Sequence, residues 1–267
     1  MLISKDFVFI HMPKTGGTFV HGIFKKIVQA YKDEHPLRWY LNRFLYRLGL
    51  TTPIYQKLIG VKYDEYPNQT VNGQHAGVAY IPKRFKKLPI ISVKRDPIEK
   101  FISAYYFRWW ERFPNLKHEY LTELFPEYPN ITISDYFKLV YEHEMKHFFH
   151  KDYREDIGVL SWQFIRMYSR SPLQVYRNID EDNFADVIKE HFYKVDFFEM
   201  KNLNEKMSKY LKGTSFAPYA HYFNKSSKIY PPGSRPDIIR EEISRELRKE
   251  VKAREWILYN YFSDYNL

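Results

Sequence analysis

The chain has 267 residues, of which 44% are hydrophobic and 19% aromatic; this excludes a disordered protein and predicts a globular one that buries a sizeable core. Its 42 lysines and arginines outnumber its 32 acidic residues, and the formal net charge of +10 favours anionic partners without choosing among them. The absence of cysteine excludes disulfides and cysteine-based zinc or redox sites.

The amino-terminal segment favours a soluble, cytoplasmic protein. The first predicted strand begins at Phe7, which leaves no room before it for a signal peptide. No stretch approaches the roughly 18 consecutive apolar residues of a membrane-spanning helix. We therefore expect a chain that does not span a membrane.

The first predicted elements are a strand, a glycine turn and a helix. Residues 7–10 form an apolar run rich in aromatic and β-branched side chains, which indicates a strand buried on both faces. Pro13 ends it, Gly16 and Gly17 permit a tight turn, and residues 18–31 continue with helical spacing. Because the first turn of a helix has unpaired N–H groups and the positive end of the dipole, this arrangement predicts an anion site.

The turn also carries side chains that suit an anion. Lys14 adds a cation, and Thr15 and Thr18 add hydroxyl donors. The order differs from a Walker A loop, in which the lysine follows the glycines. A strand-to-helix turn that uses glycine for geometry alone is the alternative interpretation.

The next segments alternate between helix and strand. Residues 32–66 are basic and aromatic and are predicted to form a helical insertion. Residues 70–77 indicate a short strand ending at the glycine-flanked His75, and residues 88–95 indicate a second buried strand. Asp96 and Pro97 then suit the N-cap and first position of a helix over 98–110.

The second half of the chain is mostly helical. Residues 111–170 have a helical pattern interrupted by prolines, and residues 194–200 indicate a further strand. A helix over 203–211, a loop over 213–232 and helical periodicity over 236–262 follow.

This alternation predicts an α/β fold, a three-layer sandwich with a mainly parallel central sheet and helical insertions. Ligands of such sheets lie beyond the carboxyl ends of the strands. The first loop, His75 and Arg95 are therefore expected on one rim of the sheet.

A family resemblance follows from these motifs. The run Pro13, Lys14, Thr15, Gly16, Gly17 and Thr18 resembles the 5′-phosphosulfate loop of sulfotransferases that use 3′-phosphoadenosine 5′-phosphosulfate (PAPS). The similarity is strongest to the carbohydrate O-sulfotransferase branch, which includes heparan sulfate 2-O-sulfotransferase. The resemblance implies a P-loop NTPase-like fold and assigns all six residues to binding PAPS.

Two further segments carry the resemblance. Arg95 followed eight residues later by Ser103 is similar to the pair that binds the 3′-phosphate in this family, and a guanidinium fork and a hydroxyl suit that group. Asn224, Lys225 and Ser226 resemble the late loop that closes over PAPS. The alternatives are a strand end with a capped helix at Arg95 and a solvated basic loop around Asn224.

The resemblance also implies catalytic roles. Sulfuryl transfer needs in-line positioning, charge stabilisation and a base for the acceptor hydroxyl, and no metal is required. Lys14 is the candidate for charge stabilisation and His75 for the base, although Gln74 separates His75 from Gly73. Glu99 and Glu144 are reserve bases, and a histidine that satisfies backbone groups is the alternative interpretation of His75.

Three other functions compete with this one. His143, Glu144 and His147 match the H-E-x-x-H pattern of zinc metallohydrolases. A nucleotide-dependent kinase would share the architecture and require Mg²⁺. A nucleic-acid-binding protein is compatible with the +10 charge and would show a steep salt dependence without turnover.

We expect a single sulfotransferase domain over residues 1–267. Its cofactor core covers about 7–110 and 185–262, and acceptor-side insertions cover about 32–66 and 111–170. The expected acceptor is a hydroxyl of a carbohydrate, with the basic charge favouring an anionic one, and no nucleic-acid partner is expected.

Overall fold

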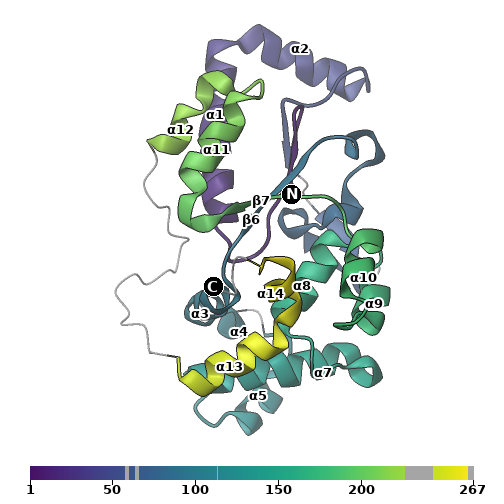
Figure 1. Ribbon diagram of the computed structural model, residues 1–267. Coiled ribbons are helices and arrows are strands. Elements are labelled where there is room, and N and C mark those ends of the chain that lie inside the picture. The colour runs from purple at the N-terminus through teal and green to yellow at the C-terminus, as the bar shows by residue number, and fades with distance from the viewer. Residues whose placement is uncertain (58–59, 64–65, 113, 226–242, 264–267) are drawn as a thin grey trace. The chain divides into compact units, whose positions relative to one another are not determined.

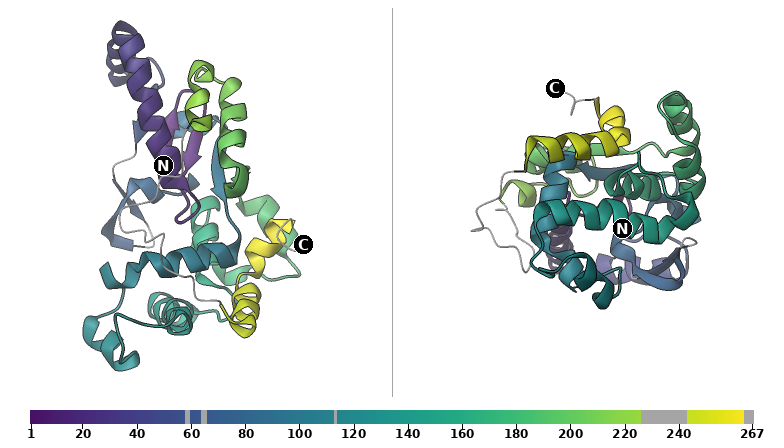
Figure 2. Two further views of the ribbon diagram at one scale, coloured as in Figure 1. Left: turned by 90° about the vertical axis from the view of Figure 1, so that its left-hand side faces the viewer. Right: turned by 90° about the horizontal axis from the view of Figure 1, so that it is seen from below.

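The computed structural model describes residues 1–57, 60–63, 66–112, 114–225 and 243–263. The chain divides into two compact units (Figures 1 and 2). The first comprises Met1–Arg95, Met167–Arg170 and Phe192–Pro231. The second comprises Asp96–Arg166, Ser171–His191 and Pro232–Leu267.

The first unit is built on a five-stranded mixed sheet, which confirms the predicted α/β class. Its strands are β1 (Leu2–Ser4), β2 (Val8–Ile10), β3 (Tyr55–Lys57), β6 (Ile90–Lys94) and β7 (Asp196–Glu199), in the order β3-β1-β2-β6-β7. Strands β2, β6 and β7 are parallel, and the continuous apolar runs of β2 and β6 predict this arrangement for those two. Strands β1 and β3 pair antiparallel at one side, so the sheet is not mainly parallel.

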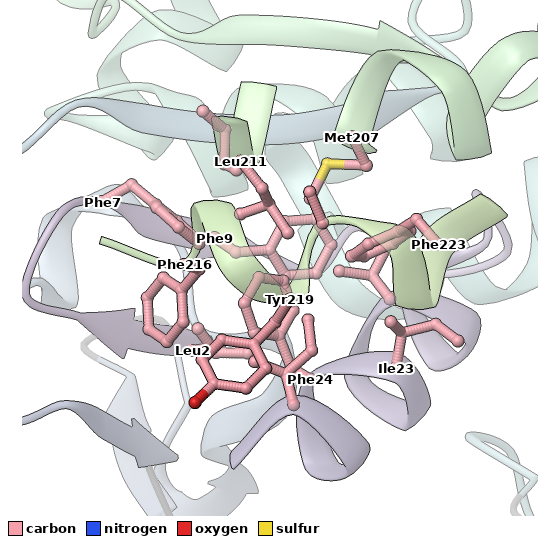
Figure 3. Close-up of a cluster of buried hydrophobic side chains, with 14 of the residues drawn as sticks. Leu2, Phe7, Phe9, Ile23, Phe24, Met207, Leu211, Phe216, Tyr219 and Phe223 are labelled. Atoms are coloured by element: carbon pink, nitrogen blue, oxygen red, sulfur yellow. The ribbon is translucent and has the colours of Figure 1, made fainter. Parts of the chain in front are cut away.

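Helices of the first unit cover a core of aromatic and aliphatic side chains (Figure 3). The helices are α1 (Gly17–Glu34), α2 (Pro36–Arg47), α11 (Leu203–Lys212) and α12 (His221–Asn224). Phe24 of α1 lies at the centre, with ring centroids 5.5 Å from Phe7 and 5.9 Å from both Phe216 and Phe223. Each aromatic ring that becomes buried stabilises the folded state by about 2 kcal/mol. The cluster therefore fixes the position of the start of α1 relative to β2.

The segment predicted as a strand over 70–77 has a different structure. Strand β5 (Tyr66–Asn72) pairs with β4 (Gly60–Tyr63) in a separate two-stranded antiparallel sheet. A 3₁₀ turn, η1 (Gly73–His75), follows, so His75 does not end a strand of the main sheet. The remaining short helices of this unit are η2 (Val78–Tyr80), η3 (Lys83–Phe85), η6 (Met200–Asn202) and η7 (Ala217–Tyr219).

Helices dominate the described part of the second unit. They are α3 (Pro97–Phe107), α4 (Trp109–Arg112), α5 (His118–Leu124), α6 (Ile133–Lys138), the π-helical turn η4 (Leu139–His143), α7 (Glu144–Phe149), η5 (His150–Asp152), α9 (Pro172–Asn178), α10 (Phe184–His191), α13 (Arg245–Arg254) and α14 (Trp256–Tyr261). Helix α8 (Val159–Tyr168) begins here and ends in the first unit. Within the described ranges, no helix is both long enough and apolar enough to cross a bilayer.

Two helix starts of the second unit are capped by carboxylates. The Asp96 side chain accepts a hydrogen bond from the Glu99 amide at 2.9 Å, and Pro97 occupies the first turn, as predicted. The buried Glu255 carboxylate accepts from the Leu160 amide at 3.0 Å and the Ser161 amide at 2.6 Å, in the first turn of α8.

Candidate anion-binding and catalytic site

The loop between β2 and α1 contains two residues in the left-handed region of backbone space. Lys14 has a φ of 62° and Gly16 a φ of 90°. Glycine adopts this conformation freely, whereas a lysine there costs on the order of 1 kcal/mol. The Thr15 hydroxyl donates to the Met12 carbonyl at 2.9 Å and holds the turn closed. A strained non-glycine residue of this kind is typical of ligand-binding loops.

The start of α1 is left open by the protein's own side chains. Its N-cap is Gly16, no side chain caps the helix, and its first turn contains no acidic residue. The amide groups and the helix dipole therefore give this turn a positive potential. Thr18 lies exposed on this turn, and Pro13 and Lys14 are half-buried just before it.

Gly17 has a role that differs from that of Gly16. A Cβ atom at Gly17 would lie 1.9 Å from Cδ2 of His11, a separation that real side chains never show. The His11 ring is buried against this backbone, with 3% of its surface exposed. Gly16 therefore supplies the turn, and Gly17 supplies the space for an imidazole ring.

Arg95 lies beside the same loop. Strands β2 and β6 are parallel, so their carboxyl ends open on the same edge of the sheet, as predicted for the loop and Arg95. The Arg95 Nη1 atom donates to the Lys14 carbonyl at 3.2 Å. Burial, and after it the nearby Arg95 charge, together lower the pKa of Lys14 to about 8. Two basic side chains therefore meet at an open helix start.

Lys94, which precedes Arg95 in the sequence, interacts with a carboxylate. Lys94 pairs in register with Glu199 of β7, and its Nζ lies 3.7 Å from the Glu199 carboxylate. The strand end thus presents one cation to a carboxylate and the next to the loop.

His75 is brought to the loop by hydrogen bonding. Its Nδ1 lies 3.1 Å from the His11 carbonyl, and the two rings are 4.7 Å apart. A carbonyl oxygen only accepts, so Nδ1 of His75 carries the proton and the lone pair resides on Nε2. In this tautomer Nε2 is the nitrogen that can accept a proton, and the contact brings His75 next to the loop despite the absence of the predicted strand.

His11 and Gln74 were not singled out by the sequence reasoning. Nε2 of Gln74 lies 2.9 Å from Nδ1 of His11, and the amide donates to the ring nitrogen. Burial, followed by the nearby His75 and His21, holds the pKa of His11 well below its ordinary value, so its ring is neutral. The Met1 nitrogen anchors the same turn by donating to the Gly73 and Gln74 carbonyls at 2.6 and 2.5 Å. The position of His11 directly after a buried strand was the signal that could have identified it.

The late loop begins next to the start of α1. Phe223 is buried, and its ring lies 6.0 Å from that of Phe19 in the first turn of α1. Asn224 ends α12 and Lys225 follows; both are exposed. Ser226 lies outside the described residues.

Ser103 and the reserve bases belong to the second unit. Ser103 is half-buried in α3, and its pairing with Arg95 stays a prediction. Glu99 is exposed in the first turn of α3. Burial raises the pKa of Glu144 to about 7, against the opposing effect of a hydrogen bond with Asn115, so Glu144 retains the properties of a reserve base.

The H-E-x-x-H residues lie where the π-helical turn η4 passes into α7. His143 ends the π-helical turn η4, and its ring packs 5.8 Å from that of Phe125. His147 is exposed, with its ring 5.8 Å from that of His150. Among the residues that the structure describes, no three histidine or acidic side chains are grouped so that they could hold a metal ion. The zinc hypothesis therefore gains no support from the described part of the chain.

Comparison of the chain with protein-family models, with curated proteins and with solved structures finds no match.

Proposed function

We propose that this chain is an O-sulfotransferase that transfers the sulfuryl group of PAPS to a hydroxyl group, with a carbohydrate as the acceptor. The observation that carries the proposal is the open start of α1, where Lys14 and Arg95 meet at a strained loop. Two basic side chains close to an uncapped helix start add to the positive potential of its amide groups, which favours a bound anion. The P-loop NTPase-like sandwich is part of the proposal and is supported by the parallel β2-β6-β7 order.

The donor set of the loop suits the phosphosulfate end of PAPS. PAPS supplies an activated sulfuryl group and leaves as 3′-phosphoadenosine 5′-phosphate (PAP). The amides at the start of α1 and the Lys14 ammonium stabilise negative charge on the departing 5′-phosphate oxygen. Arg95 supports the loop through the Lys14 carbonyl and adds positive charge to the site.

His75 is assigned the proton transfer. The acceptor hydroxyl oxygen forms the new bond to sulfur as the bond from sulfur to the 5′-phosphate oxygen breaks, and the hydroxyl proton passes to Nε2 of His75. The His11 carbonyl fixes the proton on Nδ1 of His75 and so keeps the lone pair on Nε2. Asn224 and Lys225 are proposed to contact the nucleotide, because α12 packs beside the first turn of α1.

The acceptor can be found and the base tested in one experiment. Purified protein with [³⁵S]PAPS is offered a panel of neutral and anionic oligosaccharides, and labelled products are separated by chromatography. His75→Ala should lower turnover about 10²- to 10⁴-fold, the range expected for a general base, while PAP affinity measured by calorimetry stays unchanged. Loss of PAP binding together with turnover would make His75 a structural residue, and no labelled product with any hydroxyl acceptor would contradict the proposed function.

A further inference from the structure

Helix α2 presents an apolar stripe to the exterior of the first unit. Four of its large apolar side chains and the C-cap leucine form it; Leu37 has 85% of its surface accessible and Phe44 59%. The exposed set is Leu37, Tyr40, Leu41, Phe44 and Leu48, with Leu50 following the helix. None of the residues of α2 is fully buried. In Figure 1, α2 continues from the end of α1 and lies at the edge of the unit.

The stripe is regular on the helix surface. At roughly 100° per residue, Leu37, Leu41, Phe44 and Leu48 fall within an arc of about 60°. The opposite side, with Trp39, Asn42 and Tyr46, faces the unit. These four side chains lie along one side of the helix and form a continuous apolar face. Isolated leucines scattered over a protein surface form no such face.

The inner side of α2 is held firmly in place. The Asn42 side chain donates to the Thr52 carbonyl at 3.1 Å and accepts from the Ile54 amide at 3.2 Å. The Tyr46 hydroxyl is hydrogen-bonded to Gln56 and to Arg84. The helix therefore cannot rotate to bury its outer face without losing these contacts, so the apolar stripe is a fixed surface.

Arginines flank the stripe on both sides. Arg38 lies about 100° from Leu37 in one direction, and Arg43 and Arg47 lie about 80° to 120° away in the other. All three are exposed, and residues 36–50 contain no acidic side chain. An apolar face bordered by arginines on both sides is the pattern of a helix that lies in a membrane interface, where the apolar side enters the acyl boundary and the arginines reach the phosphates.

We propose that α2 docks the protein onto an anionic lipid surface. The charge of the helix selects this occupant: a second copy of the chain would bring the same arginines together, whereas anionic headgroups complement them. The net charge of +10 adds a long-range attraction to the same surface. The proposal rests on α2 alone and does not depend on the proposed enzyme activity.

Vesicle cosedimentation of the full chain tests this docking. Binding is measured with phosphatidylcholine vesicles and with vesicles that also contain phosphatidylglycerol. The wild-type protein should bind the anionic vesicles, and the double variant Leu41→Ser/Phe44→Ser should bind at least about tenfold more weakly, because it loses the apolar insertion. Arg43→Gln/Arg47→Gln should weaken binding to the anionic vesicles on the order of tenfold.

Matched controls separate this helix from the general charge of the protein. Trp109→Ser removes an exposed aromatic side chain of the second unit, and Lys206→Gln/Lys209→Gln removes two exposed cations of α11; neither should lower binding as much as the α2 variants. All the substituted residues are exposed or half-exposed, and circular dichroism verifies the fold of each variant.

Three results would overturn the proposal. The first is no binding to anionic vesicles at low salt, and the second is binding that Leu41→Ser/Phe44→Ser leaves unchanged, which would assign the attraction to net charge alone. The third is a wild-type dimer in sedimentation that the same variant converts to a monomer, which would make a second copy the occupant.

Discussion

The starts of α1 and α3 show how one structural position can serve two purposes. Each helix follows a parallel strand, α1 after β2 and α3 after β6. Helix α3 is closed by its own chain, with the Asp96 carboxylate on the Glu99 amide and Glu99 itself in the first turn. Helix α1 has a left-handed Gly16 at its N-cap, no capping side chain and no acid in its first turn.

The capped start of α3 contributes to the stability of the fold, whereas the uncapped start of α1 is suited to binding a ligand. A cap such as Asp96 stabilises a helix by about 1 kcal/mol, and the chain forgoes that contribution at α1. It also accepts the strained backbone of Lys14 there. A helix start that the protein leaves open and surrounds with cations is suited to an external anion, whereas one filled by its own carboxylate repels it.

Removing the Lys14 amine should have the largest effect. Lys14→Gly eliminates the cation and suits the φ of 62°, so it should lower sulfuryl transfer about 10²- to 10³-fold while the fold keeps its stability or gains some. Transfer of ³⁵S and thermal unfolding measure the two effects. Near-normal turnover in this variant would remove Lys14 from the chemistry.

Placing an acidic residue in the first turn of α1, as α3 has, should give the second-largest effect. Thr18→Asp places a carboxylate on the open first turn, where it is favourable for the helix and unfavourable for a bound anion. PAP affinity should fall on the order of tenfold or more, while the thermal midpoint is unchanged or rises. Calorimetry and thermal unfolding provide the readouts, with Thr18→Ala as the control for loss of the hydroxyl; equal affinity in Thr18→Asp and Thr18→Ala would contradict an anion site.

The pH dependence of binding should reflect Lys14. Its pKa is lowered to about 8 in the free protein, and a bound anion favours the protonated form, so PAP affinity is full below pH 8 and is lost as the pH rises above it. The decrease should reach at most about tenfold per pH unit. Calorimetry from pH 7 to 10 measures it, and Lys14→Gly should give a flatter profile; parallel profiles would assign the titration to another group.

Removing the cap of α3 should have the smallest effect. Asp96→Ala should cost about 1 kcal/mol in the free energy of unfolding, measured with denaturant, because the Glu99 amide loses its acceptor. PAP affinity should change little compared with Thr18→Asp. A large loss of affinity would show that Asp96 does more than cap its helix.

Local chemistry explains what the sequence could predict. The strand, loop and helix around Lys14, and the Asp96 cap, depend on neighbouring residues, and the structure contains them nearly as predicted. The antiparallel strands β1 and β3 could not be predicted, because their pairing joins segments about fifty residues apart. His75 reaches the site through the His11 carbonyl rather than through the predicted strand, a contact that spans 64 positions.

The second unit shows another limit. The pattern of residues 133–149 indicates helix, but periodicity does not predict that Leu139–His143 form a π-helical turn, which rotates the residues that follow relative to a regular α-helix. Likewise, the spacing of α2 indicates an amphipathic helix without showing that Trp39, Asn42 and Tyr46, rather than the leucines, face the unit. Both outcomes depend on tertiary contacts.

Whether the open start of α1 binds PAP is decided by calorimetry of PAP, of ADP and of ATP with Mg²⁺, on the wild-type protein and on Lys14→Gly. We expect PAP to bind at least about tenfold more tightly than either competitor, since the charge-assisted contact that we expect between Arg95 and its 3′-phosphate adds about 1.5 to 3 kcal/mol, and we expect Lys14→Gly to weaken PAP binding. ATP that binds with Mg²⁺ as tightly as PAP, or PAP binding that Lys14→Gly leaves unchanged, would contradict this expectation.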